Sequence, residues 1–235
     1  MQIDIITAFP GLVKGGIEES IIKIAREKEL CSVNVYDLRD WTDDKHRTID
    51  DTPYGGGAGM VFKVEPLYRC LTELLENSKY DKREIILTSP RGSLITQKEM
   101  VMMSLVEQLI IICGRYKGVD QRICGLFPIR EVSIGDYVLS GGEPAAVVIT
   151  DAVTRLLPGV IHDIDSAMTD SFEDDLLDCD YYTKPREFMG ISVPDVLLTG
   201  NHEKIESWRK SNREENTFKR RPELYKKYIE QLRTK

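Results

Sequence analysis

The sequence predicts an α/β protein, in which a parallel sheet carries helices on both faces and a small, mainly helical domain follows. Three observations support this fold class. Runs of β-branched residues alternate with helical patterns over the first two thirds of the chain, which indicates a parallel sheet. Residues 109–113 are apolar throughout, as in strands that are buried on both faces. After Gly159 the alternation stops and helical patterns dominate.

The elements of the first part follow from the spacing of apolar residues. The expected strands are 2–8, 32–38, 84–88, 109–113 and 129–134. The expected helices are 17–29, 64–78, 96–106 and 143–157. Thr96 and Glu99 form the pattern of a capping box, so the third helix should begin there. Pro158 and Gly159 should end the fourth helix.

An acidic stretch separates the two expected domains. Residues 162–180 hold eight Asp and Glu residues and neither Lys nor Arg, a composition typical of a solvated linker. We therefore expect a first domain over 1–161, an interdomain linker over 162–172 and a helical domain over 173–235. Helical patterns in the last domain cover 193–198, 203–213 and 222–232.

Charge is unevenly distributed along the chain. The net charge is −7, but residues 204–235 alone carry 11 Lys/Arg and 5 Asp/Glu, a local net charge of +6. The remaining residues therefore carry −13. A basic end on an acidic body favours contact between that end and a phosphate backbone, and a solvated helical surface is the alternative.

Composition excludes several classes of protein and site. The five cysteines form no C-x-x-C pair, which favours reduced, buried thiols in a cytoplasmic protein. The three histidines show no metal-ligand spacing, so no metal site is expected. The apolar runs are too short to span a bilayer, and the N-terminus lacks the basic flank of a signal peptide. We expect no membrane partner.

Three glycine-rich segments should form a small-molecule pocket. They are 88–92, 114–118 and 134–143, and each follows an expected strand. Ligands of open α/β sheets bind at the carboxyl ends of the strands. Main-chain groups of 134–139 could read the edge of an adenine, which would explain why no conventional nucleotide motif is present.

A fourth glycine-rich segment covers residues 54–60. It is neither a P-loop nor a dinucleotide fingerprint, because the lysine and the spacing that these motifs need are missing. Titratable residues close before it (His46, Arg47, Asp50 and Asp51) favour a functional loop over a flexible surface loop.

Blocks of sequence at these segments resemble the bacterial tRNA (guanine-N1)-methyltransferases that modify position 37, the TrmD family of the SPOUT class. The blocks follow the family's order over nearly the whole chain: HRTIDDTPYGGGAGM, SPRG, GRYKGVDQR, IGDYVLSGGE, DSFEDDLLDCDYYTKP and TGNHEKIESWR. The resemblance implies a trefoil knot near residues 85–140 and a homodimer with its active site at the subunit interface. It also implies tRNA as substrate and S-adenosylmethionine as methyl donor, with S-adenosylhomocysteine as product.

The resemblance also assigns roles to individual residues. Asp170 matches the general base and Arg155 the catalytic arginine. The cofactor-binding positions are Pro90, Gly114, Tyr116, Ile134, Gly135, Asp136, Tyr137, Val138, Leu139, Gly141 and Gly142. The positions assigned to tRNA are His46, Arg47, Asp50, Gly59, Asp178, Asn201 and His202. The sequence does not indicate whether Mg²⁺ assists the reaction.

Without the resemblance, several of these residues have plainer interpretations. Asp170 stands in the acidic stretch, where a solvated carboxylate is the default. Arg155 could complement a helix dipole, and Asp178 could cap a helix. Asn201 is the expected N-cap of the helix that follows it.

Two positions depart from the family pattern. Lys117 and Gln121 stand where the family usually has acids, and a cation beside a sulfonium replaces a favourable pairing with an unfavourable one. Two other functions therefore stay open from the sequence. One is a SPOUT methyltransferase that acts on rRNA or on a ribose 2′-hydroxyl, and the other is a non-catalytic RNA- or nucleotide-binding module.

Overall fold

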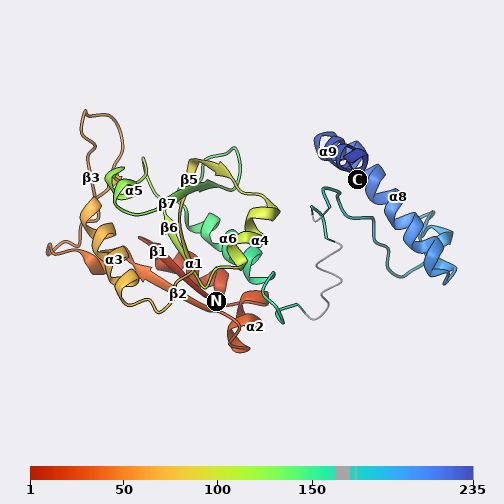
Figure 1. Cartoon of the computed structure of the whole chain (residues 1–235), viewed down its shortest axis with the longest axis horizontal. Coiled ribbons are helices and arrows are strands. Elements are labelled where there is room, and N and C mark those ends of the chain that lie inside the picture. The colour runs from red at the N-terminus through yellow and green to blue at the C-terminus, as the bar shows by residue number, and fades with distance from the viewer. Residues whose placement is uncertain (162–169, 173, 235) are drawn as a thin grey trace. The chain divides into compact units, whose positions relative to one another are not determined.

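The computed structural model of the chain describes residues 1–161, 170–172 and 174–234. These residues form two compact units, one within Met1–His162 and the other within Asp163–Lys235 (Figure 1). The expected linker 162–172 therefore lies outside the described residues, apart from 170–172. None of the described helices is long and apolar enough to cross a membrane.

The first unit is built on a five-stranded sheet in which all neighbouring strands run parallel. In spatial order its strands are β2 (Ser32–Asp37), β1 (Gln2–Thr7), β6 (Gln108–Cys113), β5 (Arg83–Leu94) and β7 (Ile129–Ser133). The predicted parallel sheet is confirmed, and all six residues of β6 are buried.

Helices pack on both faces of this sheet and form one apolar core on each face. Alternate residues of the central strands point into one core or the other. Leu109 and Ile111 join one apolar cluster, whereas Ile110 and Ile112 join the other. The first cluster includes residues of α1 (Pro10–Ile17), α2 (Ser20–Glu27), α4 (Gln97–Ser104) and α6 (Glu143–Thr154). The second includes residues of η1 (Leu38–Trp41), α3 (Val64–Glu76) and α5 (Arg122–Leu126), and Figure 1 shows α3 and α6 on opposite sides of the strands.

The helix expected over 17–29 is wrong in its extent. The chain forms α1 and α2 instead, with extended backbone at Glu19 and a positive φ of 55° at Ser20 between them. Pro10 occupies the first turn of α1, where its missing N–H is not needed. The capping box at α4 is confirmed, because the Glu99 carboxylate accepts a hydrogen bond of 2.9 Å from the Thr96 N–H.

A carboxylate lies at the centre of the sheet. Asp4 of β1 is fully buried and accepts hydrogen bonds from four side chains: Gln2, Asn34, Tyr36 and Gln108, the last at 2.6 Å. Burial, together with the Asp4 charge, raises the pKa of the Tyr36 phenol to about 12. A polar cluster therefore ties three neighbouring strands together where apolar packing alone would be expected.

The hydrogen-bonded pairing of β5 with β7 is interrupted near the carboxyl end of β5. Its pairing with β7 runs to Thr88 and resumes at Ser93, so residues 89–92 protrude. A side chain at Gly92 would meet the β7 main chain, because its Cβ would lie 2.2 Å from the Val132 nitrogen. Only glycine allows the protruding segment to return so close to β7.

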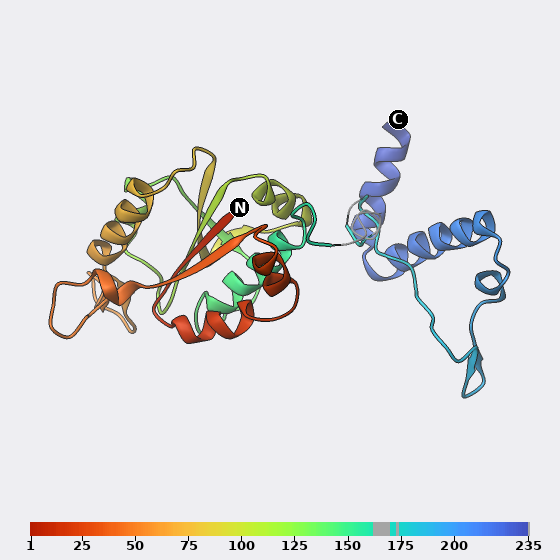
Figure 2. The same cartoon turned by 90° about the horizontal axis from the view of Figure 1, so that it is seen from below.

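The short β3 (Asp50–Asp51) and β4 (Val61–Phe62) pair antiparallel and enclose the glycine-rich segment 54–60. The second unit contains a hairpin of β8 (Glu187–Phe188) and β9 (Ile191–Ser192), followed by η2 (Asp195–Leu198), α8 (His202–Arg220) and α9 (Pro222–Thr234). Figure 2 shows α8 and α9, in blue, running in different directions from the turn that joins them. Helix α8 is longer than the predicted 203–213, and the helix predicted at 193–198 is only a 3₁₀ turn.

Candidate functional site

A cavity opens at the carboxyl ends of β5, β6 and β7. Its walls come from the three glycine-rich segments that the sequence singles out, and Ala145 of α6 completes them. Ten of the eleven predicted cofactor positions line it: Pro90, Gly114, Tyr116, Ile134, Gly135, Tyr137, Val138, Leu139, Gly141 and Gly142. Asp136 is outside this lining and its side chain is exposed. The structure therefore brings together residues that lie up to 52 positions apart in the sequence, from Pro90 to Gly142.

Hydrogen bonds around Thr88 fix the three segments to one another. The Thr88 hydroxyl donates to the Ile112 carbonyl at 3.1 Å and accepts from the Gly114 N–H at 3.4 Å. The Gly142 N–H in turn donates to the Gly114 carbonyl at 2.8 Å. A Cβ at Gly142 would lie 1.9 Å from the Thr88 hydroxyl oxygen, so the third segment can approach this closely only with glycine.

The cavity fits a flat, partly apolar group with a hydrogen-bonding edge. Within the part of the chain that the structure describes, the main-chain N–H groups of Val138 and Leu139 donate to no other residue. Large exposed side chains border these open donors: Tyr116, Tyr137, Val138 and Leu139. Apolar walls with a few placed polar groups are the usual features of a small-molecule site, and a purine matches both features.

Charged side chains in the lining come mainly from the first two segments. Arg91 donates to the Glu131 carboxylate at 2.9 Å and to the Gln121 side chain at 3.0 Å. The Arg115 guanidinium lies over the Phe9 ring, 3.8 Å from its centroid. Gln121, one of the two departures from the family pattern, thus serves as a neutral acceptor for Arg91.

Lys117, the other departure, lines the cavity and packs its methylene stem beside Gly59. A Cβ at Gly59 would lie 3.1 Å from the Lys117 Cγ, and the φ of Gly59 is +100°. The main chain of this region is also joined to the segment before β4, because the Lys117 N–H donates to the Met60 carbonyl at 3.0 Å. The 54–60 segment is therefore held next to the cavity.

A cysteine directly precedes the second segment, but its chemistry is that of a packing residue. Burial, together with the nearby Glu143 carboxylate, raises the pKa of the Cys113 thiol well above its usual range. The thiol form is a poor nucleophile, so the arrangement does not favour covalent catalysis by Cys113.

Four of the predicted tRNA contacts lie in the first unit. Asp50 belongs to β3, opposite Phe62 of β4, and Gly59 lies in the turn between these strands. His46 and Arg47 are exposed, and Arg47 forms an ion pair with Asp40. The pairing of β3 with β4 places Asp50 and Gly59 in one hairpin.

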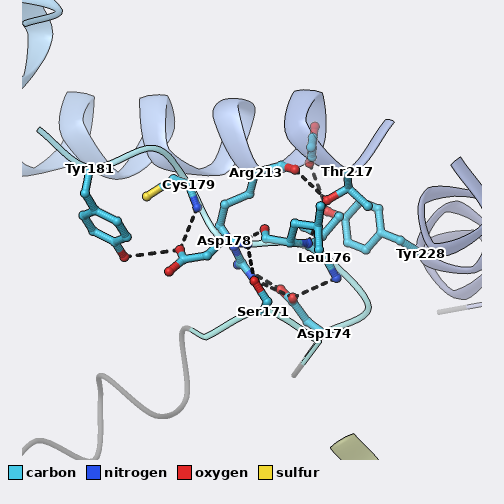
Figure 3. Close-up of polar contacts among 11 residues, drawn as sticks. Ser171, Asp174, Leu176, Asp178, Cys179, Tyr181, Arg213, Thr217 and Tyr228 are labelled. Carbon is cyan, nitrogen blue, oxygen red and sulfur yellow. Dashed lines mark hydrogen bonds and ion pairs between the residues drawn. The ribbon is translucent and has the colours of Figure 1, made fainter. Parts of the chain in front are cut away.

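The other three predicted tRNA contacts lie in the second unit. The Asn201 side chain caps α8 by accepting from the Lys204 N–H at 3.1 Å, which confirms the predicted N-cap, and His202 is the exposed first residue of that helix. The Asp178 carboxylate accepts from the Cys179 N–H at 2.6 Å and from the Tyr181 hydroxyl at 3.2 Å (Figure 3). Burial and this carboxylate raise the pKa of the Tyr181 phenol, so it stays a donor at neutral pH.

The predicted catalytic pair is divided between the units. Arg155 follows α6 in the first unit, and its N–H donates to the Asp151 carbonyl at 3.0 Å. Asp170 is half-buried in the second unit, next to Ser171.

Comparison with known proteins identifies the family of this chain. Residues 1–227 match the family model described as tRNA (Guanine-1)-methyltransferase TrmD. The chain belongs to this family. Three bacterial proteins named tRNA (guanine-N(1)-)-methyltransferase are similar to it over most of their length. The protein of Dictyoglomus turgidum is 50% identical over 97% of this chain and 91% of its own. Those of Chlorobaculum tepidum and Flavobacterium johnsoniae are 46% and 48% identical, over 98% and 97% of this chain and 99% and 100% of their own.

Sequence reasoning on this TrmD-family chain missed the side chains that support the loops. Arg91 stands in the recognised SPRG block, but its partner Glu131 lies 40 residues further along, in β7. Arg213 and Thr217 in α8 hold the segment after Asp170, over separations of 36 to 40 residues. The first pair joins the neighbouring strands β5 and β7, whose order in the sheet the sequence did not predict, and no pattern in the sequence indicates the second pair.

Proposed function

We propose that this chain transfers the methyl group of S-adenosylmethionine to N1 of the guanosine at position 37 of tRNA. Membership of the TrmD family is the observation that carries this proposal. The cavity supports it, because it lies at the carboxyl ends of parallel strands and offers the open main-chain donors of Val138 and Leu139 beside apolar walls.

The cofactor would be held by residues of the three glycine-rich segments. Bound there, S-adenosylmethionine supplies a methyl group on a positively charged sulfur, and the transfer leaves S-adenosylhomocysteine. The N–H groups of Val138 and Leu139 suit the adenine edge, and the close approach of Gly114 to Gly142 sets the width of the cavity. The Lys117 ammonium lies beside the same cavity, so its stem must keep the charge away from the sulfonium.

Asp170 and Arg155 would perform the proton chemistry. Guanine N1 carries a proton at neutral pH, and its removal places negative charge on O6. Asp170 takes this proton, and the Arg155 guanidinium stabilises the charge on O6. An ordinary Asp is about five pKa units less basic than deprotonated guanine N1, a cost of roughly 7 kcal/mol. The stabilisation of O6 by Arg155 lowers this cost by making the guanine more acidic.

The same proposal includes the architecture that the family implies. The segments around the cavity form a trefoil knot near residues 85–140, and two chains form a homodimer whose active sites lie at the subunit interface. The basic helices of the 173–235 domain bind the phosphate backbone of tRNA, and the target base turns out of its stack. The enzyme works in the cytoplasm.

The test is methyl transfer from a labelled donor to total tRNA and, in a parallel reaction, to rRNA, followed by identification of the modified nucleoside. N1-methylguanosine at position 37 is expected, and it stops primer extension because N1 can no longer pair. A ribose methyl, which is read through, or methylated rRNA would contradict the proposal.

The role of Asp170 has its own test. Asp170→Asn should reduce methyl transfer by at least 1,000-fold, on the order expected when general base catalysis is lost, with unchanged cofactor affinity by calorimetry. Asp81→Asn, at an exposed carboxylate of the first unit, is the control and should retain activity. Full activity of Asp170→Asn would remove this carboxylate from the mechanism.

A further inference from the structure

The segment that follows Asp170 lies along α8 and is joined to it by polar contacts, some of them partly buried (Figure 3). Thr217 of α8 is fully buried, and its hydroxyl makes two hydrogen bonds. It accepts from the Leu177 N–H at 2.8 Å and donates to the Arg213 carbonyl at 2.7 Å. One hydroxyl thus links the main chain of the segment to the main chain of the helix.

Arg213 binds the same segment from one turn earlier in α8. Its guanidinium donates two hydrogen bonds to the Asp174 carboxylate, at 2.6 and 3.0 Å, and a third to the Leu177 carbonyl at 3.3 Å. The side chain is only 17% exposed. These two hydrogen bonds fix the orientation of the Asp174 carboxylate as well as its distance from α8, which a lysine ammonium could not do.

The segment is itself folded into a tight turn that needs external support. The Phe172 N–H donates to the Leu176 carbonyl at 2.8 Å, and the Asp178 N–H donates to the Ser171 hydroxyl at 2.9 Å. Phe172 and Asp175 have positive φ values of 80° and 63°. Such backbone conformations persist in residues other than glycine only where the surroundings hold them.

These contacts form a continuous path from α8 to the residue before Ser171. Thr217 and Arg213 fix Leu177 and Asp174, and the Asp178 N–H fixes Ser171. Asp170 is the next residue along the chain. Because a displacement of about 1 Å can reduce a reaction rate by about 100-fold, this support matters if Asp170 is the base.

We propose that Arg213 and Thr217 are positioning residues that fix the main chain beside Asp170 to α8. The inference rests on the proposed function, because it needs Asp170 as the general base. It gives Arg213 a role that differs from that of the other cations of α8. Arg213 turns its donors inward to Asp174 and Leu177, whereas Arg209, Lys210, Lys219 and Arg220 are exposed.

A pair of substitutions at Thr217 provides the main test. Thr217→Val keeps the shape but removes the hydroxyl, whereas Thr217→Ser keeps the hydroxyl. We expect kcat to fall by about 10- to 100-fold in Thr217→Val and to stay within about threefold of the wild type in Thr217→Ser. The KM for the methyl donor and the Kd for tRNA should stay within about twofold in both variants.

Hydrogen exchange provides a readout that does not depend on catalysis. In Thr217→Val, the amides of Leu177 and Asp178 should exchange at least about tenfold faster than in Thr217→Ser. Tyr228→Phe is the stability control, because it removes the hydrogen bond to Glu214 (3.0 Å) and leaves the segment's contacts intact. It should lower the melting temperature without changing kcat.

A double-mutant cycle tests whether Arg213 acts through Asp174. Arg213→Gln and Asp174→Asn should each lower kcat about tenfold, and the double variant should be no slower than the slower single variant. Additive losses would mean that Arg213 acts elsewhere, for example on tRNA, and would overturn the proposal.

Two further results would overturn it. One is full kcat in Thr217→Val together with faster exchange at Leu177, which would make the contact structural only. The other is an equal loss of kcat in Thr217→Ser and Thr217→Val. Failure of Asp170→Asn to lower activity would instead contradict the proposed base, while the exchange result would still report whether α8 holds the segment.

Discussion

The two units of this chain hold their functional residues by different means. In the first unit, two apolar clusters on the faces of a parallel sheet fix the strand ends, and the cavity is a consequence of where the strands stop. In the second unit, only a few described apolar residues are buried, namely Leu176, Cys179, Leu224 and Tyr228. Hydrogen bonds and ion pairs hold the segment after Asp170 instead.

This difference teaches where each site is sensitive. Packing sets the shape of the cavity, so added volume should change it most. Polar contacts set the position of the proposed base, so the loss of single hydrogen bonds should matter there.

The largest effect is expected from added volume in the cavity. Gly142→Ala would place a methyl group 1.9 Å from the Thr88 hydroxyl and 2.9 Å from the Gly114 nitrogen, so the loops must separate. We expect cofactor affinity to fall by about 100-fold or more by calorimetry, a loss of roughly 3 kcal/mol. Gly15→Ala is the control, because no atom lies within 4 Å of its Cβ, and it should bind normally. Normal binding by Gly142→Ala would mean that the cavity is not the cofactor site.

The next effect concerns the buried carboxylate in the sheet of the first unit. Asp4→Ala would leave the buried Gln108 and three partly buried side-chain donors without their acceptor. We expect the free energy of unfolding of the first unit to fall by about 3 kcal/mol in urea titrations. A change below about 0.5 kcal/mol would show that packing alone holds this sheet. Asp81→Asn, at an exposed position, should leave stability unchanged.

A smaller effect is expected from one hydrogen bond in the second unit. Tyr228→Phe removes the contact with Glu214 that joins α9 to α8. The free energy of unfolding of this unit should fall by about 1 kcal/mol, measured by thermal melting. An unchanged free energy of unfolding would show that this hydrogen bond does not stabilise the second unit.

The smallest effect is a pH dependence confined to alkaline solution. Tyr36 has a pKa of about 12 in the folded chain, above the value of about 10 for an unfolded chain. Because the folded pKa is raised, its contribution to stability is fully present below about pH 10 and is lost as the pH rises towards 12. Tyr181 also ionises late because its pKa is raised, so ultraviolet titration should show one late ionisation fewer in Tyr36→Phe than in the wild type. The same number of late ionisations in both proteins would contradict the assignment.

The sequence predicted the sheet well because its strands carry strong local patterns. Residues 109–113 are apolar without a break, and the structure buries every one of them. The three glycine-rich segments were predicted to meet because parallel strands share one carboxyl edge, and they line one cavity. The capping box at Thr96 was predicted because both partners lie within one helical turn.

The missed features depend on contacts between distant residues. The break at Ser20 between α1 and α2 interrupts an amphipathic pattern that runs on through it. Strands β3 and β4 have two residues each. Phe62 is held in place because its N–H donates to the Gly118 carbonyl and its carbonyl accepts from the Asp120 N–H. The support that Arg213 gives to Asp174 joins residues 39 apart, and nothing local in α8 distinguishes Arg213 from the other cations.

The order of strands in the sheet has a consequence for synthesis on the ribosome. Strand β6 lies between β1 and β5, and β5 pairs only with β6 and β7, which are both made later. A nascent chain that has emerged from the ribosome as far as residue 107 therefore exposes β5 with both edges open, while β1 and β2 can already pair. Such edges readily join other chains. The stage at which β5 has emerged and β6 has not should therefore be the one at which this polypeptide most needs a chaperone.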